Sequence, residues 1–230
     1  MLSMWQRRAR QYRFQDGHRH DHRVGPDNCK VSSPEYRAQL DDEYVLITHS
    51  LGSRVTVDAL QWMAEDINAS ALHDPAMDKL MKLVQHKRFT FFMLSNQLPL
   101  LQLGQAKPEV HGRIDKICGP GAPNSNERLL EETHLVAVSD PNDLFSYAIS
   151  SRFLDDYMDS RICPTLTNVI LNVAKVVNLF GVDFANPVAA HTEYDNDERI
   201  IGLITKGIGN NHVDPTVARR CNWLETLPEK

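Results

Sequence analysis

The sequence has little of what marks several large classes of protein. It carries 25 basic against 30 acidic residues, for a formal net charge of −5. Phosphate-backbone binding needs clustered lysine and arginine, so we expect no nucleic acid partner. The longest apolar stretch, residues 166–180, is interrupted by polar residues and is shorter than the roughly 20 residues that span a bilayer. We therefore expect no transmembrane segment.

Closely spaced cysteines are also lacking. The four cysteines, Cys29, Cys118, Cys163 and Cys221, form no CxxC pair. Their spacing indicates neither a zinc knuckle nor a disulfide-dense scaffold, and it leaves the redox compartment open. The start of the chain is rich in arginine but has no apolar secretory core. We expect a cytoplasmic protein, with mitochondrial targeting as the alternative, and neither a cofactor nor a metal ion.

The chain is long and apolar enough for one sizeable domain, since it has 230 residues of which 42% are hydrophobic. Residues 1–33 are polar and basic, contain alternating histidines and show no apolar period, which predicts a disordered or loosely packed tail. The sequence predicts an ordered domain over 34–210, opened by a short helix with Ser33 as its cap and Pro34 in its first turn. A C-terminal tail is expected over 211–230.

Strand-like and helix-like segments alternate along this domain. Tyr44–Ile47 is a short continuous apolar run, typical of a strand buried on both faces of a parallel sheet. The other expected elements are helices over 51–67, 75–86 and 166–180, strands over 88–94 and 134–138, a long loop over 95–133, and a last apolar segment over 200–204. This alternation predicts an α/β fold with a mostly parallel sheet and helices on both faces.

A serine lies where the first strand should turn into the first long helix. In Thr48-His-Ser50-Leu-Gly52, the residues two before and two after Ser50 are small, as a sharp strand-to-helix turn demands. Four of the five places of the G-x-S-x-G pattern are met if threonine replaces the first glycine. Tyr44–Val55 resembles the nucleophile elbow of the α/β-hydrolase superfamily, and the resemblance covers roughly residues 35–206. It implies that Ser50 is a nucleophile, followed in the chain by an acid and a histidine.

Both partners have candidates in the expected order. The strand over 134–138 runs into an acidic turn, in which Asp143 before an apolar residue matches the family better than Asp140 before Pro141. Asp140 stays as the alternative acid. His191 precedes a polar-started helical segment, with a tyrosine three residues later as in similar hydrolases, and we expect it in a loop. His212 in the C-terminal tail is the reserve candidate.

The resemblance implies a Ser-His-Asp triad that forms an acyl-enzyme. His191 would take the proton of Ser50, Asp143 would orient His191, and the Leu51 N–H would supply one oxyanion-hole donor. The expected substrate is a small-molecule carboxylic ester, with lipid esters as one candidate. The alternatives are a thioesterase or peptidase with the same triad, and a catalytically weak or inactive hydrolase-like fragment that acts by binding.

The segment before the first strand departs from the family. Two upstream strand-and-crossover units need about 60 residues, whereas 43 residues precede Tyr44 and contain no strand-like apolar run. The loop that supplies the second oxyanion donor in this fold should lie there. We therefore expect an N-terminally truncated sheet, and the sequence does not decide the oligomeric state.

Overall fold

The structure is a computed structural model that describes residues 44–71 and 74–206. All the described residues belong to one compact unit. The tails predicted over 1–33 and 211–230 and the helix expected at Pro34 lie outside the described residues. His212 lies outside them as well.

Four parallel strands form the main sheet. They are β1 (Tyr44–His49), β2 (Arg88–Leu94), β3 (Glu132–Ser139) and β4 (Pro164–Ile170), in the spatial order β1-β2-β3-β4. Helical segments connect each strand to the next, as parallel pairing requires. The predicted α/β class with a mostly parallel sheet is confirmed.

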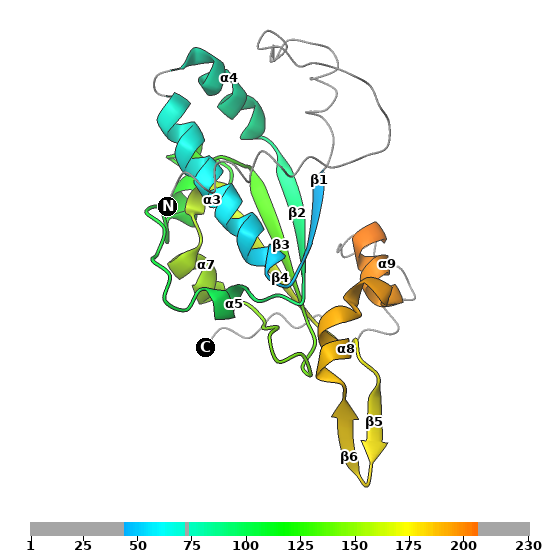
Figure 1. The fold of residues 1–230 in the computed structure, drawn as a ribbon. Coiled ribbons are helices and arrows are strands. Elements are labelled where there is room, and N and C mark those ends of the chain that lie inside the picture. Colours follow the sequence, from blue (N-terminus) through cyan, green and yellow to red (C-terminus); the bar gives the residue numbers. More distant parts are fainter. Residues whose placement is uncertain (1–43, 72–73, 207–230) are drawn as a thin grey trace, which may run out of the picture. The chain divides into compact units, whose positions relative to one another are not determined.

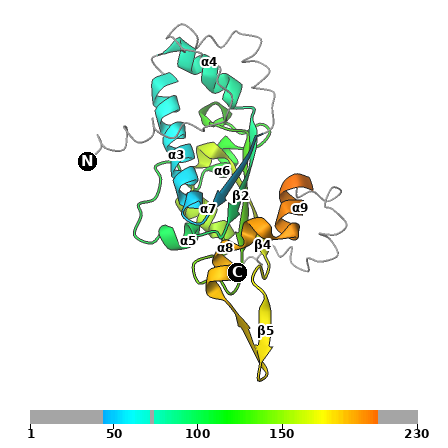
Figure 2. The same ribbon diagram turned by 45° about the vertical axis from the view of Figure 1, so that its right-hand side comes forward.

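Helices cover both faces of this sheet (Figures 1 and 2). The connections between the strands pack on one face, where α3 (Gly52–Ala71) and α4 (Pro75–Val84) follow β1, and α7 (Ser151–Tyr157) follows β3. The opposite face is covered by α9 (Glu198–Lys206) and the 3-10 turn η4 (Tyr194–Asn196). Alternate strand residues enter the two resulting cores, because successive strand side chains point to opposite faces. Phe91, Met93 and Leu135 lie in the first core, and Phe92, Leu94 and Val136 lie in the second.

The prediction that Tyr44–Ile47 is buried on both faces is wrong. Val45 and Ile47 are 50% and 52% exposed, whereas Leu46 packs against the core under α3. Among the described residues β1 pairs only with β2, and the helices of the second face pack over β2, β3 and β4. The apolar run therefore belongs to an edge strand with one covered face.

The predicted helix over 166–180 is also wrong. Its first half is strand β4, and its second half is β5 (Val176–Leu179), which pairs with β6 (Val182–Ala185) as an antiparallel hairpin. The hairpin leads into α8 (Pro187–Thr192) and extends away from the sheet in both views (Figures 1 and 2). Valines three and four apart suggested a helix, but β-branched residues fit a pleated surface at least as well.

The long segment between β2 and β3 contains short helices in place of a continuous loop. These are α5 (Leu98–Leu101), α6 (Ile114–Ile117) and the 3-10 turn η2 (Ser125–Glu127). Cys118 ends α6 and forms a disulfide with Cys163, which ends the 3-10 turn η3 (Ser160–Ile162) directly before β4. Within the described ranges, no helix has the length and apolarity that crossing a membrane requires.

Candidate functional site

The first strand ends in a strained turn at Ser50. Its φ is +56°, in the left-handed region where a residue with a side chain pays about 1–2 kcal/mol. The Ser50 N–H donates a 2.9 Å hydrogen bond to the carbonyl of Leu94, and the Ser53 hydroxyl donates a 2.9 Å bond back to the Ser50 carbonyl. These two bonds hold the turn between the end of β2 and the first turn of α3.

Gly52 is required at this turn because Thr48 lies against it. A Cβ atom at position 52 would lie 3.1 Å from the Thr48 Cβ, closer than two such atoms normally approach. Thr48 therefore replaces the first glycine of the elbow pattern only because the second glycine leaves room for it. A side chain at position 52 would therefore collide with the side chain of Thr48.

Asp143 and His191 are brought together at the same edge of the sheet. The His191 Nδ1 atom lies 3.0 Å from Asp143 Oδ1 and 3.1 Å from Oδ2, across 48 positions of sequence. The Asp143 side chain is fully buried, whereas the His191 side chain is 22% exposed. The carboxylate is therefore shielded from solvent while the imidazole remains accessible.

The ionised Asp143 carboxylate accepts several hydrogen bonds. Its burial acts to raise the pKa of the carboxyl group, but hydrogen bonds from the Ser95 hydroxyl, the Phe145 N–H and His191 outweigh burial and hold that pKa below its ordinary value. The Phe145 N–H lies 3.0 Å from Oδ1. A buried anion with this support can orient a neighbouring imidazole and stabilise its protonated form.

Asp140, the alternative acid, is engaged elsewhere. One of its carboxylate oxygens accepts a bond from the Asn142 N–H, and the other accepts bonds from the Val173 and Ala174 N–H groups. These contacts fix the turn after β3 to the segment after β4. The described structure contains no hydrogen bond between Asp140 and His191, so geometry favours Asp143 as the partner of the imidazole.

His191 lies inside the short helix α8, and the loop expected for it is not observed. Asn186 caps this helix by accepting bonds from the Val188 and Ala189 N–H groups, and Pro187 occupies the first turn. That Asn-Pro pair was a helix-start signal which the sequence interpretation missed.

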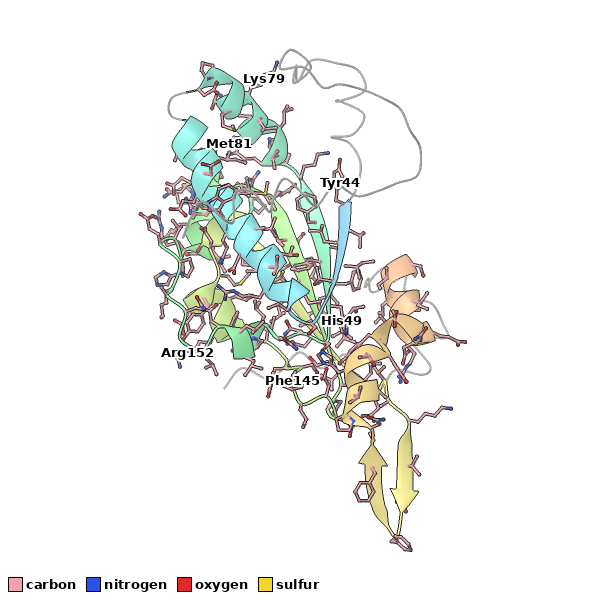
Figure 3. The ribbon with its side chains drawn as sticks, viewed as in Figure 1. Tyr44, His49, Lys79, Met81, Phe145 and Arg152 are labelled. Carbon is pink, nitrogen blue, oxygen red and sulfur yellow. A yellow bond between two sulfur atoms is a disulfide. The ribbon has the colours of Figure 1, made fainter. Side chains whose placement is uncertain are left out.

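Two aromatic rings flank the imidazole. The His49 and Phe145 rings lie edge-on to that of His191, with centroids 5.2 Å and 5.7 Å away. Both residues are labelled in Figure 3, where His49 ends β1 and Phe145 lies in the segment after β3. His49 also donates from Nε2 to the His191 carbonyl over 2.7 Å. It thereby ties the elbow to the helix that carries the candidate base.

Tyr194 contacts both acidic residues of the turn after β3. It is completely buried, and its hydroxyl accepts a 2.8 Å bond from the Asp140 N–H while lying 3.3 Å from Asp143 Oδ2. Burial raises the pKa of this phenol far above its ordinary value, so the hydroxyl stays neutral. The tyrosine noted three residues after His191 therefore links the acidic turn to the segment after α8.

Ser95 is the site residue that sequence reasoning missed. It directly follows β2, has a φ of +50° and is fully buried. Its hydroxyl lies 2.6 Å from Asp143 Oδ2 and 2.9 Å from His191 Nδ1. The available signal was positional, because Ser50 and Ser95 each directly follow a strand of the same sheet.

Asn96 holds the segment after Ser95 against the acidic turn. Its side-chain amide donates to the Tyr147 carbonyl over 2.6 Å, and its backbone N–H donates to the Val138 carbonyl over 3.1 Å. Asn96 is fully buried. Ser95 and Asp143 are therefore fixed on two turns that are directly bonded to each other.

Ser50 is half-buried beside this network. Among the residues that the structure describes, neither the Ser50 hydroxyl nor His191 Nε2 forms a hydrogen bond, and the Leu51 N–H has no acceptor. These three groups are the ones that a bound substrate would use, and such contacts often tighten only in the complex. The arrangement is chemically suited to proton transfer and to attack on an acyl carbon.

The described ranges, 44–71 and 74–206, contain no group of three or more His, Cys, Asp or Glu side chains arranged to hold an ion. Comparisons with protein-family models, curated proteins and solved structures found no significant match. The class that the fold defines is a parallel α/β protein.

Proposed function

We propose that this protein is a serine hydrolase of the α/β-hydrolase type that cleaves carboxylic esters. Ser50 is the nucleophile, His191 the general base and Asp143 the buried acid that orients His191. The observation that carries the proposal is the Asp143–His191 pair, 3.0 Å apart, at the sheet edge where Ser50 holds a strained turn. Ser50 directly follows β1, Asp143 lies in the turn after β3, and α8 brings His191 to that turn, which chance placement of an Asx turn and a surface histidine does not explain.

The chemistry follows the acyl-enzyme route. His191 Nε2 takes the Ser50 hydroxyl proton as Ser50 Oγ bonds to the acyl carbon, and the carbonyl electrons move onto the oxygen. The Leu51 N–H stabilises that oxyanion. The protonated His191 then gives its proton to the leaving alkoxide as the carbonyl re-forms, and water later releases the acid by the same steps.

The described strands correspond, in this proposal, to the nucleophile strand of a hydrolase sheet and those that follow it. Support comes from β1, which exposes Val45 and Ile47 where further elements would pack in a larger sheet. A small-molecule or lipid ester is the proposed substrate class. Exposed Phe145, whose ring lies against His191, and its exposed neighbour in sequence Leu144 favour an apolar acyl group.

Labelling with a fluorophosphonate tests the activity, because only an activated serine reacts with it. We expect the full chain to be labelled, and the Ser50→Ala and His191→Ala variants to lose labelling while remaining folded. Ser125→Ala, which removes a hydroxyl from the turn η2, is the matched control and should label normally. A folded wild-type chain that takes no label would contradict the proposal and would favour a hydrolase-like binding protein.

A further inference from the structure

We propose that Ser95 is a positioning residue that sets the tautomer of His191, so that Nδ1 carries the hydrogen and Nε2 keeps its lone pair for the nucleophile's proton. The inference rests on the proposed function for its catalytic consequence. Its structural content, which nitrogen of His191 is protonated and why, stands on the contacts among Ser95, Asp143 and His191.

The number of hydrogens available to Ser95 and Asp143 fixes the direction of their hydrogen bonds. A serine hydroxyl has one hydrogen to donate, and an ionised carboxylate can only accept. Because Ser95 Oγ lies 2.6 Å from Asp143 Oδ2, that hydrogen is used on the carboxylate. Toward His191 Nδ1, 2.9 Å away, the oxygen can then act only as an acceptor. The hydrogen between them must come from Nδ1.

The contacts between His191 and Asp143 favour the same tautomer. Nδ1 lies 3.0 and 3.1 Å from the two carboxylate oxygens, so a bare nitrogen lone pair would face an anion. With the hydrogen on Nδ1, the His191 N–H donates a shared hydrogen bond to the Asp143 carboxylate and the Ser95 oxygen. With the hydrogen on Nε2, Ser95 could satisfy Asp143 or His191 but not both.

Other groups hold the carboxylate without touching the imidazole nitrogen. The Phe145 N–H donates to Oδ1 over 3.0 Å, and the Tyr194 hydroxyl lies 3.3 Å from Oδ2. Within the described part of the chain, only Ser95 has hydrogen-bond contacts with both Asp143 and His191 Nδ1. The three-membered contact among hydroxyl, carboxylate and imidazole is therefore the feature that couples acid to base.

The backbone at this position does not itself require serine. Ser95 has a φ of +50°, a conformation that glycine adopts without strain. A purely structural role in turning the chain after β2 would therefore be served at least as well by glycine. This difference makes Ser95→Gly a variant that keeps the turn and removes the whole side chain, whereas Ser95→Ala removes the hydroxyl alone.

Kinetics of Ser95→Gly and Ser95→Ala on a soluble p-nitrophenyl ester give the first readout. We expect kcat to fall about 10- to 100-fold, the loss that corresponds to one charge-assisted hydrogen bond, while KM changes little. Because Asp143 loses a bond that holds its pKa down, its carboxyl group should be protonated at higher pH in both variants, which unfolding measured as a function of pH would show. Ser160→Ala is the matched control, since Ser160 is also fully buried and its oxygen accepts from the Arg113 N–H over 3.1 Å. That control should lower stability and leave kcat unchanged.

Nitrogen NMR of labelled histidine gives a second readout that needs no activity. Recorded at neutral pH in the Ser50→Ala chain, the His191 signals should report the Nδ1–H tautomer, and adding Ser95→Gly should shift them toward a mixture. An Nε2–H tautomer before that change, or signals that Ser95→Gly leaves unaltered, would overturn the inference. A wild-type chain that shows the expected tautomer but takes no fluorophosphonate would contradict the proposed function alone.

Discussion

The two ends of the parallel sheet are held by different kinds of interaction. At the carboxyl ends of the strands, Asp143 collects hydrogen bonds from Ser95, Phe145 and His191. At the amino ends, the Cys118–Cys163 disulfide closes a span of 45 residues directly before β4. A cavity of about 490 Å³ lies beside that disulfide, lined by Arg88, Glu131 and Thr165 among others.

We expect the carboxyl end of the sheet to determine reactivity and the amino end to determine stability. The carboxyl end depends on donors and acceptors placed within tenths of an ångström, so removing one atom should change reactivity more than folding. The amino end depends on a covalent link, so removing it should change folding more than reactivity. Substitutions at one end therefore test whether the property that depends on the other end changes.

Asp143→Asn should have the largest effect on reactivity. An amide can present its N–H to His191 and favour the wrong tautomer, a change that typically lowers turnover about 10,000-fold. Asp140→Asn should affect turnover far less and stability more, because Asp140 holds the Val173 and Ala174 N–H groups. Ester hydrolysis and denaturant unfolding of both variants check this, and equal losses of turnover would contradict the assignment of the acid.

Opening the disulfide should give the largest effect on stability. For a closed span of this length, chain entropy predicts that its loss lowers the free energy of unfolding by about 4 kcal/mol. Cys118→Ser with Cys163→Ser removes it without leaving a free thiol at either position. The fluorophosphonate reaction of the fraction that stays folded should be unchanged. A slower reaction in that fraction would mean that the two ends are coupled.

Gly52→Ala should damage the elbow by a smaller amount. The added methyl group meets the Thr48 Cβ at 3.1 Å, and overpacking of this kind typically costs about 1–3 kcal/mol. Labelling of Ser50 should slow because the turn must shift. The double variant with Thr48→Gly, which restores the space, should recover both stability and labelling. Absence of recovery would show that the contact is not the cause.

Lowering the pH should gradually reduce the stability that the Asp143 carboxylate contributes, and this is the smallest expected effect. The folded-state pKa of Asp143 lies below its ordinary value of 3.8, so the native state favours the ionised carboxylate. Its contribution is fully present well above that value and is lost as pH falls through the depressed folded pKa. Unfolding measured from pH 5 downward should show a shallower pH dependence in Asp143→Asn, by at most one proton. An unchanged slope would contradict the depressed pKa.

Much of the sheet was predictable because short apolar runs between turn residues mark parallel strands. Arg88–Leu94 forms β2 as expected, and the strand predicted over 134–138 lies within β3. The burial of β1 was not predictable, since its apolar run says nothing about which neighbours cover it. The segment 166–180 failed because its valines match both a helical and an alternating pattern, and pairing of β4 with β3 decides between them.

The residues of the candidate site were predictable to the extent that they carry local signals. Ser50 is marked by small neighbours, and Asp143 and His191 by their order and setting. Ser95 and His49 carry no such signal, because their roles arise from contacts across 48 and 142 positions of sequence. Only the register that sets the ends of β1 and β2 side by side brings these residues to one place.

The most direct test of the account is to map the serine that a fluorophosphonate modifies. The full chain would be treated in the folded state and after denaturation, then digested and analysed by peptide mass spectrometry. We predict a single phosphonylated serine, Ser50, in the folded chain and no modification after denaturation. Modification of a different serine, or of none in a chain shown to be folded, would contradict the claim that the carboxyl end of this sheet is an active site.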